Sequence, residues 1–309
     1  MKYIEVQCNN CGSTESRVIA KGPDFEYRCA GDEEFKIVEC NSCGLVYLNP
    51  KPAPEELAAI YPENYIPYRF DEHLSPIVNK ARMTLQKSKV RAISSFAGPD
   101  DVIWDVGCGG GFLLQCMQKY GPSGWRLLGI DISERALEKV RSRGIDALCG
   151  RFETMDLQPE SANIIILNQV IEHLDDPAAV VAKAHSVLKP GGHLFIETPS
   201  LDGWDAKLFS PRHWGGWHFP RHWTLYTRET MKKLLEEKGF SIVKLEWLLS
   251  PNFWAQSVHH VLVDRGISEK WAQFMDCKNL FVMCFFSALD VFQTLFGHTS
   301  NMRIVGRKA

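Results

Sequence analysis

The feature that most constrains the fold of this chain is a short apolar run that ends in a cluster of glycines. The run Val102-Ile-Trp-Asp-Val106 is rich in β-branched residues, as buried parallel strands are. Glycines occupy four of the next five positions, and a helical pattern begins at Phe112. Because glycine lacks a Cβ atom, this arrangement predicts an α/β ligand site at which backbone N–H groups face the ligand.

The glycine spacing argues against a dinucleotide ligand. A dinucleotide fingerprint needs glycine at its first, third and sixth positions. Counted from Gly107 the sixth position is Phe112, and counted from Gly109 it is Leu114. The carboxylate of Asp105 would also repel a pyrophosphate at close range, whereas it suits a cation such as an amino-acid ammonium.

Composition and charge set the broad class of the protein. The chain has 309 residues, of which 45% are hydrophobic, and this is ordinary for one large globular domain with an accessory piece. The net charge of −2 and the lack of a long basic run argue against nucleic-acid binding. The first residues carry no apolar stretch of signal-peptide length, so we expect a cytoplasmic protein.

Four of the ten cysteines form two Cys-x-x-Cys pairs, Cys8 with Cys11 and Cys40 with Cys43. In a reducing compartment such pairs indicate a metal, and four thiolates form the tetrahedral set that Zn²⁺ prefers. We therefore predict a zinc-ribbon-like module over residues 1–50. A closed site of this kind is structural or positions a substrate. Reduced cysteines without metal, or a redox pair, are the alternatives.

The rest of the chain divides into a linker, a main domain and an insertion. Residues 25–28 and 35–38 alternate in polarity and predict ribbon strands, and residues 51–99 predict a linker and a helix with a basic face. Strands and helices then alternate, which indicates a parallel sheet covered on both faces and a domain over 100–249 and 300–309. The expected strands are 102–106, 126–130, 146–149, 162–168, 193–198, 240–248 and 302–306, and the main helices are 133–143, 177–188 and 228–238.

The insertion over residues 250–299 is unusually apolar. Its stretch 280–296 is shorter than the roughly 20 residues of a membrane span, and Asp290 lies within it. Three interpretations stay open: a helix packed on the domain or at a homodimer contact, a lid, and a helix that meets a membrane surface or a lipidic substrate.

The motif Asp105-Val-Gly-Cys-Gly-Gly-Gly111 resembles motif I of the class I S-adenosylmethionine-dependent methyltransferases. Segments 150–153, 167–177 and 189–199 resemble the following motifs of that family, in the same order. The resemblance covers about residues 100–200. It implies a Rossmann-like seven-stranded sheet, S-adenosylmethionine as cofactor, and a helix over 76–97 that covers the cofactor pocket.

The resemblance and the strand ends together give the candidate cofactor residues. Asp131 ends the second strand, where a carboxylate accepts two hydrogen bonds from a ribose diol; an ordinary solvated aspartate at a helix start is the alternative. Ile132 is expected beside the adenine. The full set is Asp105, Gly107, Gly109, Gly111, Asp131, Ile132, Phe152 and Asn168.

The end of the fourth strand carries a Glu-His pair. Ubiquinone-type O-methyltransferases have a Glu-x-x-Glu-His metal cluster at the corresponding place, and the positions here are Gln169, Glu172 and His173. An amide donates less charge to Mg²⁺ than a carboxylate, so a role for Mg²⁺ stays open. His173 is a candidate general base, or else it caps the loop.

A loop of tryptophans and histidines follows the fifth strand, where open α/β sheets bind substrate. Its segment from Trp214 to Trp223 resembles segments of methyltransferases from sugar and polysaccharide gene clusters. The aromatic rings suit stacking on a sugar, and Arg212 or Arg221 suits a phosphate; the alternative is a flap that seals the cofactor. His218 and His222 join His173 as catalytic candidates, with His173 or His222 expected to remove the acceptor's proton.

These features predict a methyltransferase for a small-molecule acceptor, in the first instance a sugar, sugar nucleotide or glycolipid. C-methyltransferases for nucleotide-linked ketosugars have a similar zinc-binding front end. A lipid quinone or another lipidic acceptor is the alternative suggested by the Glu-His pair and the apolar insertion. An alternative from another class is a cofactor-binding scaffold with weak turnover, whose ribbon docks a partner.

Overall fold

The glycine-ended strand lies in the middle of a seven-stranded sheet in the computed structural model, which describes residues 1–31, 33–61, 76–275 and 279–309. Every neighbouring pair is parallel except those that involve β13, which runs antiparallel to both of its neighbours. The strand order reverses between β6 and β9, and such a switch point opens a crevice at the strand carboxyl ends. The spatial order is β12 (Phe240–Trp247), β13 (Asn301–Lys308), β10 (Leu188–Pro199), β9 (Ala162–Asn168), β6 (Val102–Val106), β7 (Arg126–Asp131) and β8 (Asp146–Cys149).

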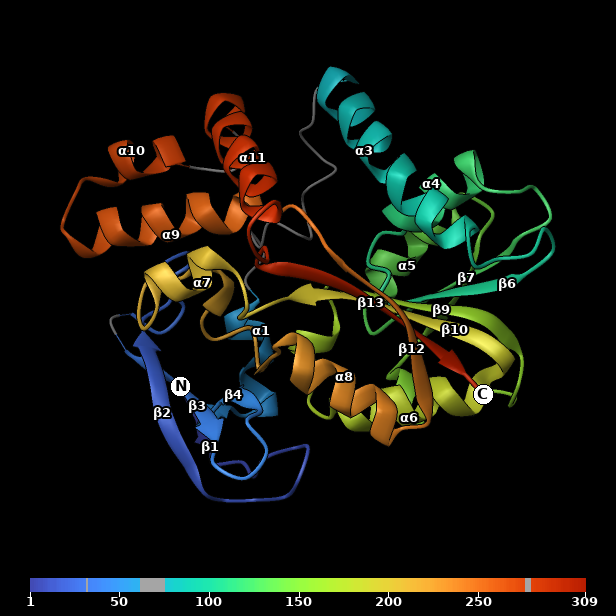
Figure 1. The fold of residues 1–309 in the computed structure, drawn as a ribbon, viewed down its shortest axis with the longest axis horizontal. Helices are drawn as coiled ribbons and strands as arrows, with labels where there is room; N and C mark the ends of the chain where they lie inside the picture. The colour runs from blue at the N-terminus through green and yellow to red at the C-terminus, as the bar shows by residue number, and fades with distance from the viewer. Residues whose placement is uncertain (32, 62–75, 276–278) are drawn as a thin grey trace.

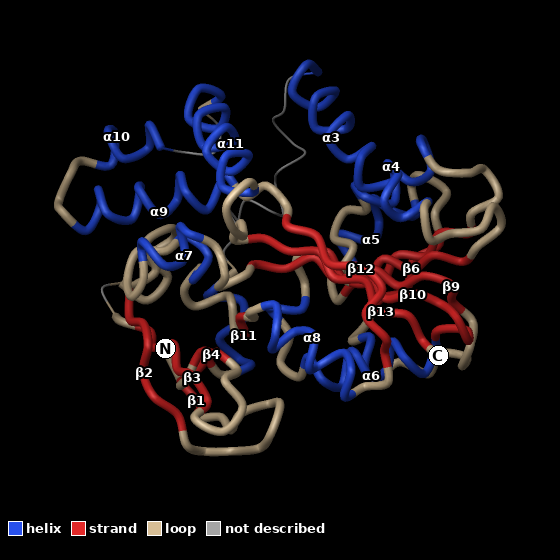
Figure 2. The backbone as a smooth tube through the Cα atoms, viewed as in Figure 1, coloured by secondary structure: helices blue, strands red, loops and turns tan. Residues whose placement is uncertain are grey.

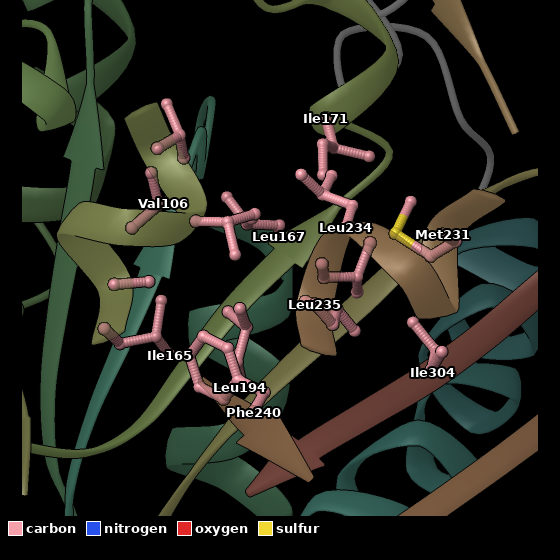
Figure 3. Close-up of a cluster of buried hydrophobic side chains, with 14 of the residues drawn as sticks. Val106, Ile165, Leu167, Ile171, Leu194, Met231, Leu234, Leu235, Phe240 and Ile304 are labelled. Carbon is pink, nitrogen blue, oxygen red and sulfur yellow. The ribbon is translucent and has the colours of Figure 1, made fainter. Parts of the chain in front are cut away.

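The sheet is apolar on both faces because helices cover both of them (Figures 1 and 2). Along β9, Ile164 and Ile166 face one hydrophobic cluster, while Ile165 and Leu167 face another. This alternation follows from the two-residue period of a strand. The first cluster includes α3 (Pro76–Ser94), α4 (Phe112–Tyr120) and α5 (Glu134–Arg141), and the second, drawn in Figure 3, includes α6 (Pro177–Val187) and α8 (Arg228–Glu237).

Two of the predicted helices begin with a side-chain N-cap. The Ser133 side chain accepts a hydrogen bond from the Ala136 N–H at the start of α5. Thr227 and Thr230 form a reciprocal capping box at the start of α8. Such caps satisfy N–H groups that lack partners within the helix.

The N-terminal module contains β1 (Tyr3–Ile4), β2 (Ser16–Gly22), β3 (Phe35–Cys40), β4 (Val46–Leu48) and β5 (Lys51–Pro52). The prediction of a strand over residues 25–28 is wrong, because this segment is a turn. The side chain of Asp24 accepts hydrogen bonds from the N–H groups of Glu26, Tyr27 and Cys29. An aspartate that bonds nearby backbone groups in this way favours a turn over a strand.

The module and the main domain share a sheet and a core. β11 (Thr224–Leu225) follows β10 in the chain but pairs antiparallel with β4, so the small sheet has the order β11, β4, β3, β2. Beside it, Trp214, Trp217 and Trp223 are buried with Ile37 and Leu48 of the module. The remaining short elements of the module and the main domain are η1 (Pro54–Glu56), α1 (Leu57–Ile60), η2 (Phe152–Thr154), η3 (Ile171–His173), α7 (Trp204–Phe209) and η4 (Gly215–Trp217). Residues 62–75 of the predicted linker lie outside the described residues.

The insertion is helical, with α9 (Pro251–Asp264), α10 (Glu269–Ala272), η5 (Gln273–Met275) and α11 (Leu280–Thr294) (Figure 1). α9 contacts α7, η4 and α11. Asp290 of α11 is buried and accepts a hydrogen bond from Trp254 Nε1 at 2.9 Å. The other face of α11 is solvent-exposed and apolar, and Phe281 is 84% exposed. Among the described residues, no helix is both long enough and apolar enough to span a bilayer.

One buried ion pair joins the N-terminal module to the loop before β11. Arg221 is fully buried, and its guanidinium donates to both carboxylate oxygens of Asp24, at 3.1 and 2.9 Å. The same side chain donates through Nε to the Ile60 carbonyl at 2.7 Å. A buried charge is tolerated only when it is paired, so this ion pair holds the two segments in one arrangement.

We expect Asp24→Asn to lower the free energy of unfolding by about 3–5 kcal/mol, because it leaves the buried Arg221 without a counter-charge. Urea denaturation followed by fluorescence measures the change. The matched control is Glu39→Gln at the exposed Arg17–Glu39 pair, where a loss of at most about 1 kcal/mol is expected. Equal losses in the two variants would contradict a special role of the buried pair.

Candidate active site

The glycine loop between β6 and α4 combines tight packing with an open side. Gly107 and Gly111 have φ of 72° and 73°, and Cβ atoms there would lie 2.5 Å from Val170 Cγ2 and 2.7 Å from Val140 Cγ2. A Cβ on Gly109 would meet no described atom within 4 Å. The first two glycines let the loop pack closely, whereas at Gly109 the backbone is open to a ligand.

Asp131 lies at the end of β7 beside this loop. Its Oδ2 accepts the Gly109 N–H at 2.8 Å, and its Oδ1 accepts the Ser133 N–H at 2.9 Å. The carboxylate is therefore fixed in orientation at the edge of the loop. Of the two residues expected near an adenine, Ile132 is 72% exposed and Phe152 is buried.

A group of charges lies at the carboxyl ends of β6, β9 and β10. Burial raises the pKa of Asp105 to about 7, although the positive charge of Lys89 opposes the rise. Lys89 of α3 donates to Asn168 Oδ1 at 2.6 Å and pairs with Glu197 Oε2 at 2.5 Å. Arg303 of β13 holds the other oxygen of Glu197, with Nε at 2.7 Å. The site thus contains a buried carboxyl, Asp105, that a cationic ligand would stabilise.

Sequence reasoning missed Lys89 and Glu197. The signal for Glu197 was its place inside a buried strand, where an unpaired carboxylate is costly. Lys89 was visible only as one of several basic residues on the predicted covering helix. Their pairing could not be read from the chain, because they are far apart in sequence.

The three candidate catalytic histidines lie together. The ring centroids of His173 and His222 are 4.8 Å apart, and those of His218 and His222 are 4.9 Å apart. The loop that carries two of them is tied to η3, since the Trp223 N–H donates to the Glu172 carbonyl at 2.7 Å. His173 belongs to the segment directly after β9, and Val170 in the same segment packs against Gly107 of the glycine loop.

The histidines differ in their surroundings and partners. Burial lowers the pKa of His173 to about 3, with the nearby His218 adding to the effect, and burial also lowers the pKa of His222 well below its ordinary value. Both are neutral at pH 7. His218 Nδ1 lies 2.7 Å from Oε1 of Glu26, a residue of the N-terminal module. Although burial opposes it, the interaction with His218, including their hydrogen bond, holds the pKa of Glu26 below its usual range. Sequence reasoning missed Glu26.

Glu172 is fully buried beside these histidines. Burial raises the pKa of its carboxyl group to about 8, and Thr198 Oγ1 donates to its Oε2 at 3.0 Å. The amide at position 169 does not complete a Glu-x-x-Glu-His set, because Gln169 Nε2 donates to Asn301 Oδ1 of β13 at 3.1 Å. The described residues at these three positions therefore do not fit the Mg²⁺ site that the resemblance implies.

The loop residues expected to meet a sugar phosphate are engaged within the protein. Arg221 is buried on Asp24, and Arg212 pairs with Asp264 and Glu34. Trp214 and Trp217 are also buried. These side chains join the module, the loop and α9, and neither guanidinium can hold a phosphate without breaking an ion pair.

The four predicted metal-binding cysteines form a compact cluster. Sγ of Cys8 lies 3.4 Å from Sγ of Cys43, and Sγ of Cys11 lies 3.5 Å from Sγ of Cys40. All four sulfur atoms lie within 4.8 Å of one another. A tetrahedral Zn²⁺ with bonds of about 2.3 Å needs sulfurs about 3.8 Å apart, so the cluster is compatible with zinc.

A family model described as a methyltransferase domain matches residues 78–245, more than half of the chain. The chain belongs to the methyltransferase-domain family. This match and the seven-stranded sheet, together with the separate cysteine cluster near the N-terminus, confirm the predicted fold class.

Relatives and solved structures agree with this family. The ubiquinone biosynthesis O-methyltransferase of Idiomarina loihiensis is 34% identical over 124 residues, covering 37% of this chain and 50% of the relative. That of Methylococcus capsulatus is 36% identical over 128 residues, covering 39% and 50%. The chain thus spans about half the length of these curated relatives. A protein assigned as a sarcosine dimethylglycine methyltransferase from Galdieria sulphuraria has the same fold, with a TM-score of 0.50, 17% identity, and coverage of 75% of this chain and 87% of that one.

In this methyltransferase domain we expect Asp131→Ala to weaken S-adenosylmethionine binding by at least about a hundredfold. The carboxylate would accept two hydrogen bonds from the ribose, and bonds to a charged group contribute about 1.5–3 kcal/mol each. Titration calorimetry measures the Kd. The control is Glu138→Ala, an exposed residue of the adjacent α5. An unchanged Kd in Asp131→Ala would remove the ribose assignment.

We expect protein purified without chelator to contain zinc bound by the cysteine cluster. The double substitution Cys11→Ser and Cys43→Ser should remove about one zinc per chain and lower Tm, because four-thiolate sites stabilise small modules. Elemental analysis by mass spectrometry measures the metal. Cys284→Ser, an exposed cysteine on α11, should change neither value. Full zinc content in the double variant would contradict the assignment.

Proposed function

We propose that this chain transfers a methyl group from S-adenosylmethionine to a hydroxyl group of a small lipidic acceptor. The observation that carries the proposal is the proximity of two groups at the switch point of the sheet. The glycine loop, Asp131 and Asp105 suit the cofactor. His173 of the histidine cluster follows the adjacent strand β9, and Val170, just before it in the chain, packs against Gly107 of the loop. Family membership and the relatives support the reaction type.

The cofactor residues have separate roles in this proposal. Gly107, Gly109 and Gly111 let the backbone approach the methionine part, and Asp105 faces its positive charge. Asp131 accepts hydrogen bonds from the ribose hydroxyls, and Ile132 and Phe152 border the adenine. Asn168, the last residue of β9, lies near the methyl group. The protein contributes mainly by positioning the two substrates and excluding water.

The proton of the acceptor hydroxyl needs a base, and we assign this role to His218. Its Nδ1 lies 2.7 Å from Glu26, and a carboxylate there orients the imidazole and stabilises the imidazolium that forms. The acceptor oxygen attacks the methyl carbon, the carbon–sulfur bond breaks, and the proton passes to His218. S-adenosylhomocysteine leaves as a neutral thioether. His173 and His222, which are neutral, form the adjacent wall of the acceptor site.

Two observations favour a lipidic acceptor over a sugar. Two relatives that match more than a third of this chain are named ubiquinone biosynthesis O-methyltransferases. The exposed apolar face of α10 and α11 would allow contact with a membrane surface that holds such an acceptor. Its most exposed residues are Trp271, Leu280, Phe281, Phe285, Leu295 and Phe296. A sugar or sugar nucleotide is the second candidate, favoured by the sequence of the segment from Trp214 to Trp223.

The test is methyl transfer from labelled S-adenosylmethionine to two acceptor sets, short-chain catechol-type quinols and sugar nucleotides. We expect turnover of the first set and a fall in kcat of at least about a hundredfold in His218→Gln, with the Kd of the cofactor unchanged. His185→Gln on α6 is the control. Methylation of sugar nucleotides alone would replace the acceptor assignment, and cofactor binding without turnover of either set would favour the scaffold alternative.

A further inference from the structure

Glu172, His173 and His222 bring one carboxylate and two imidazoles to one place. Each offers a ligand atom, and the three atoms lie within 4.8 Å of one another. Glu172 and His173 belong to η3, and His222 belongs to the loop before β11. We infer that these residues form a binding site for a divalent transition metal, with Zn²⁺ the favoured ion.

The hydrogen bonds of both histidines prepare one ring nitrogen for a metal. His173 Nδ1 lies 3.0 Å from the Arg221 carbonyl, and His222 Nδ1 lies 2.8 Å from the Gly216 carbonyl. A carbonyl only accepts, so each Nδ1 carries the hydrogen and each Nε2 keeps a lone pair. Tyr61 Oη, 3.2 Å from His173 Nδ1, can share that hydrogen. Metal-binding histidines are commonly oriented by such a carbonyl on the second nitrogen.

Glu172 supplies a second, independent observation. Its side chain is fully buried, its Oε2 accepts from Thr198, and its Oε1 has no hydrogen-bond partner within the described part of the chain. An orphaned buried oxygen is rare in folded proteins and costs about 1–3 kcal/mol. Coordination of a cation by Oε1 would satisfy the oxygen.

The ligand types identify the class of ion. Two imidazoles and one carboxylate suit Zn²⁺ or another first-row metal, whereas Mg²⁺ prefers oxygen ligands and keeps several waters. The set also differs from a Glu-x-x-Glu-His cluster, because His222 from a distant loop takes the place of a carboxylate. Three protein ligands leave a position open for a water or an acceptor oxygen. Only this last role, binding the acceptor, rests on the proposed function.

The experiment counts zinc in the full chain after loading and gel filtration. We expect about two zinc ions per chain in the unmodified protein and about one in Glu172→Gln or His222→Gln, because each substitution removes a ligand. Glutamine preserves the size of Glu172 and the acceptor for Thr198. The cysteine double variant should also retain about one, and His185→Gln should retain about two. Circular dichroism checks that each variant folds.

Cobalt provides a second readout if a variant is unstable. Co²⁺ bound by thiolates absorbs strongly in the near ultraviolet, whereas Co²⁺ bound by imidazole and carboxylate gives only weak visible bands. In the cysteine double variant we expect the weak bands alone, and their loss on adding Glu172→Gln. One zinc per chain that is unaffected by Glu172→Gln, with no weak cobalt bands, would overturn the inference. Cofactor binding and turnover, measured separately, would then still decide the proposed function.

Discussion

The active site depends on the buried ion pair between Arg221 and Asp24. This pair fixes the loop before β11 against the N-terminal module, and the carbonyl of Arg221 accepts from His173. The next residue in the chain, His222, is placed by the same loop. Since a buried guanidinium cannot be left without its counter-charge, the loop has little freedom to move from the module. In the proposed function, the module therefore helps to form the acceptor site, because it holds this loop and contributes Glu26 beside His218.

The parts of the fold that the sequence predicted best are those fixed by local pattern. Buried strands such as β9 and the glycine loop follow from β-branched runs and from positions that exclude a Cβ. The turn at residues 25–28 was mistaken for a strand because its residues alternate in polarity. The backbone there follows the hydrogen bonds of Asp24 instead.

The parts that could not be predicted are contacts between distant segments. Glu26 contacts His218, and Lys89 contacts Glu197. The residues of each pair are far apart in the chain, so no sequence spacing predicts that they meet. The tryptophans of the loop illustrate the same limit. A large aromatic side chain suits both ligand stacking and core packing. Trp214 and Trp217 serve core packing, because both are buried at the junction with the module.

Two buried carboxyl groups near the carboxyl ends of the central strands differ in how their charge is compensated. Asp105 lies near the ammonium of Lys89, whereas Glu172 accepts a hydrogen bond from the neutral hydroxyl of Thr198. Burial raises the pKa of both, to about 7 and about 8, so neither is fully satisfied as an anion by the protein alone. A cation bound nearby would stabilise each in its charged form. In the function and the metal site that we propose, the cofactor would bring one such charge beside Asp105 and a bound ion would bring the other beside Glu172.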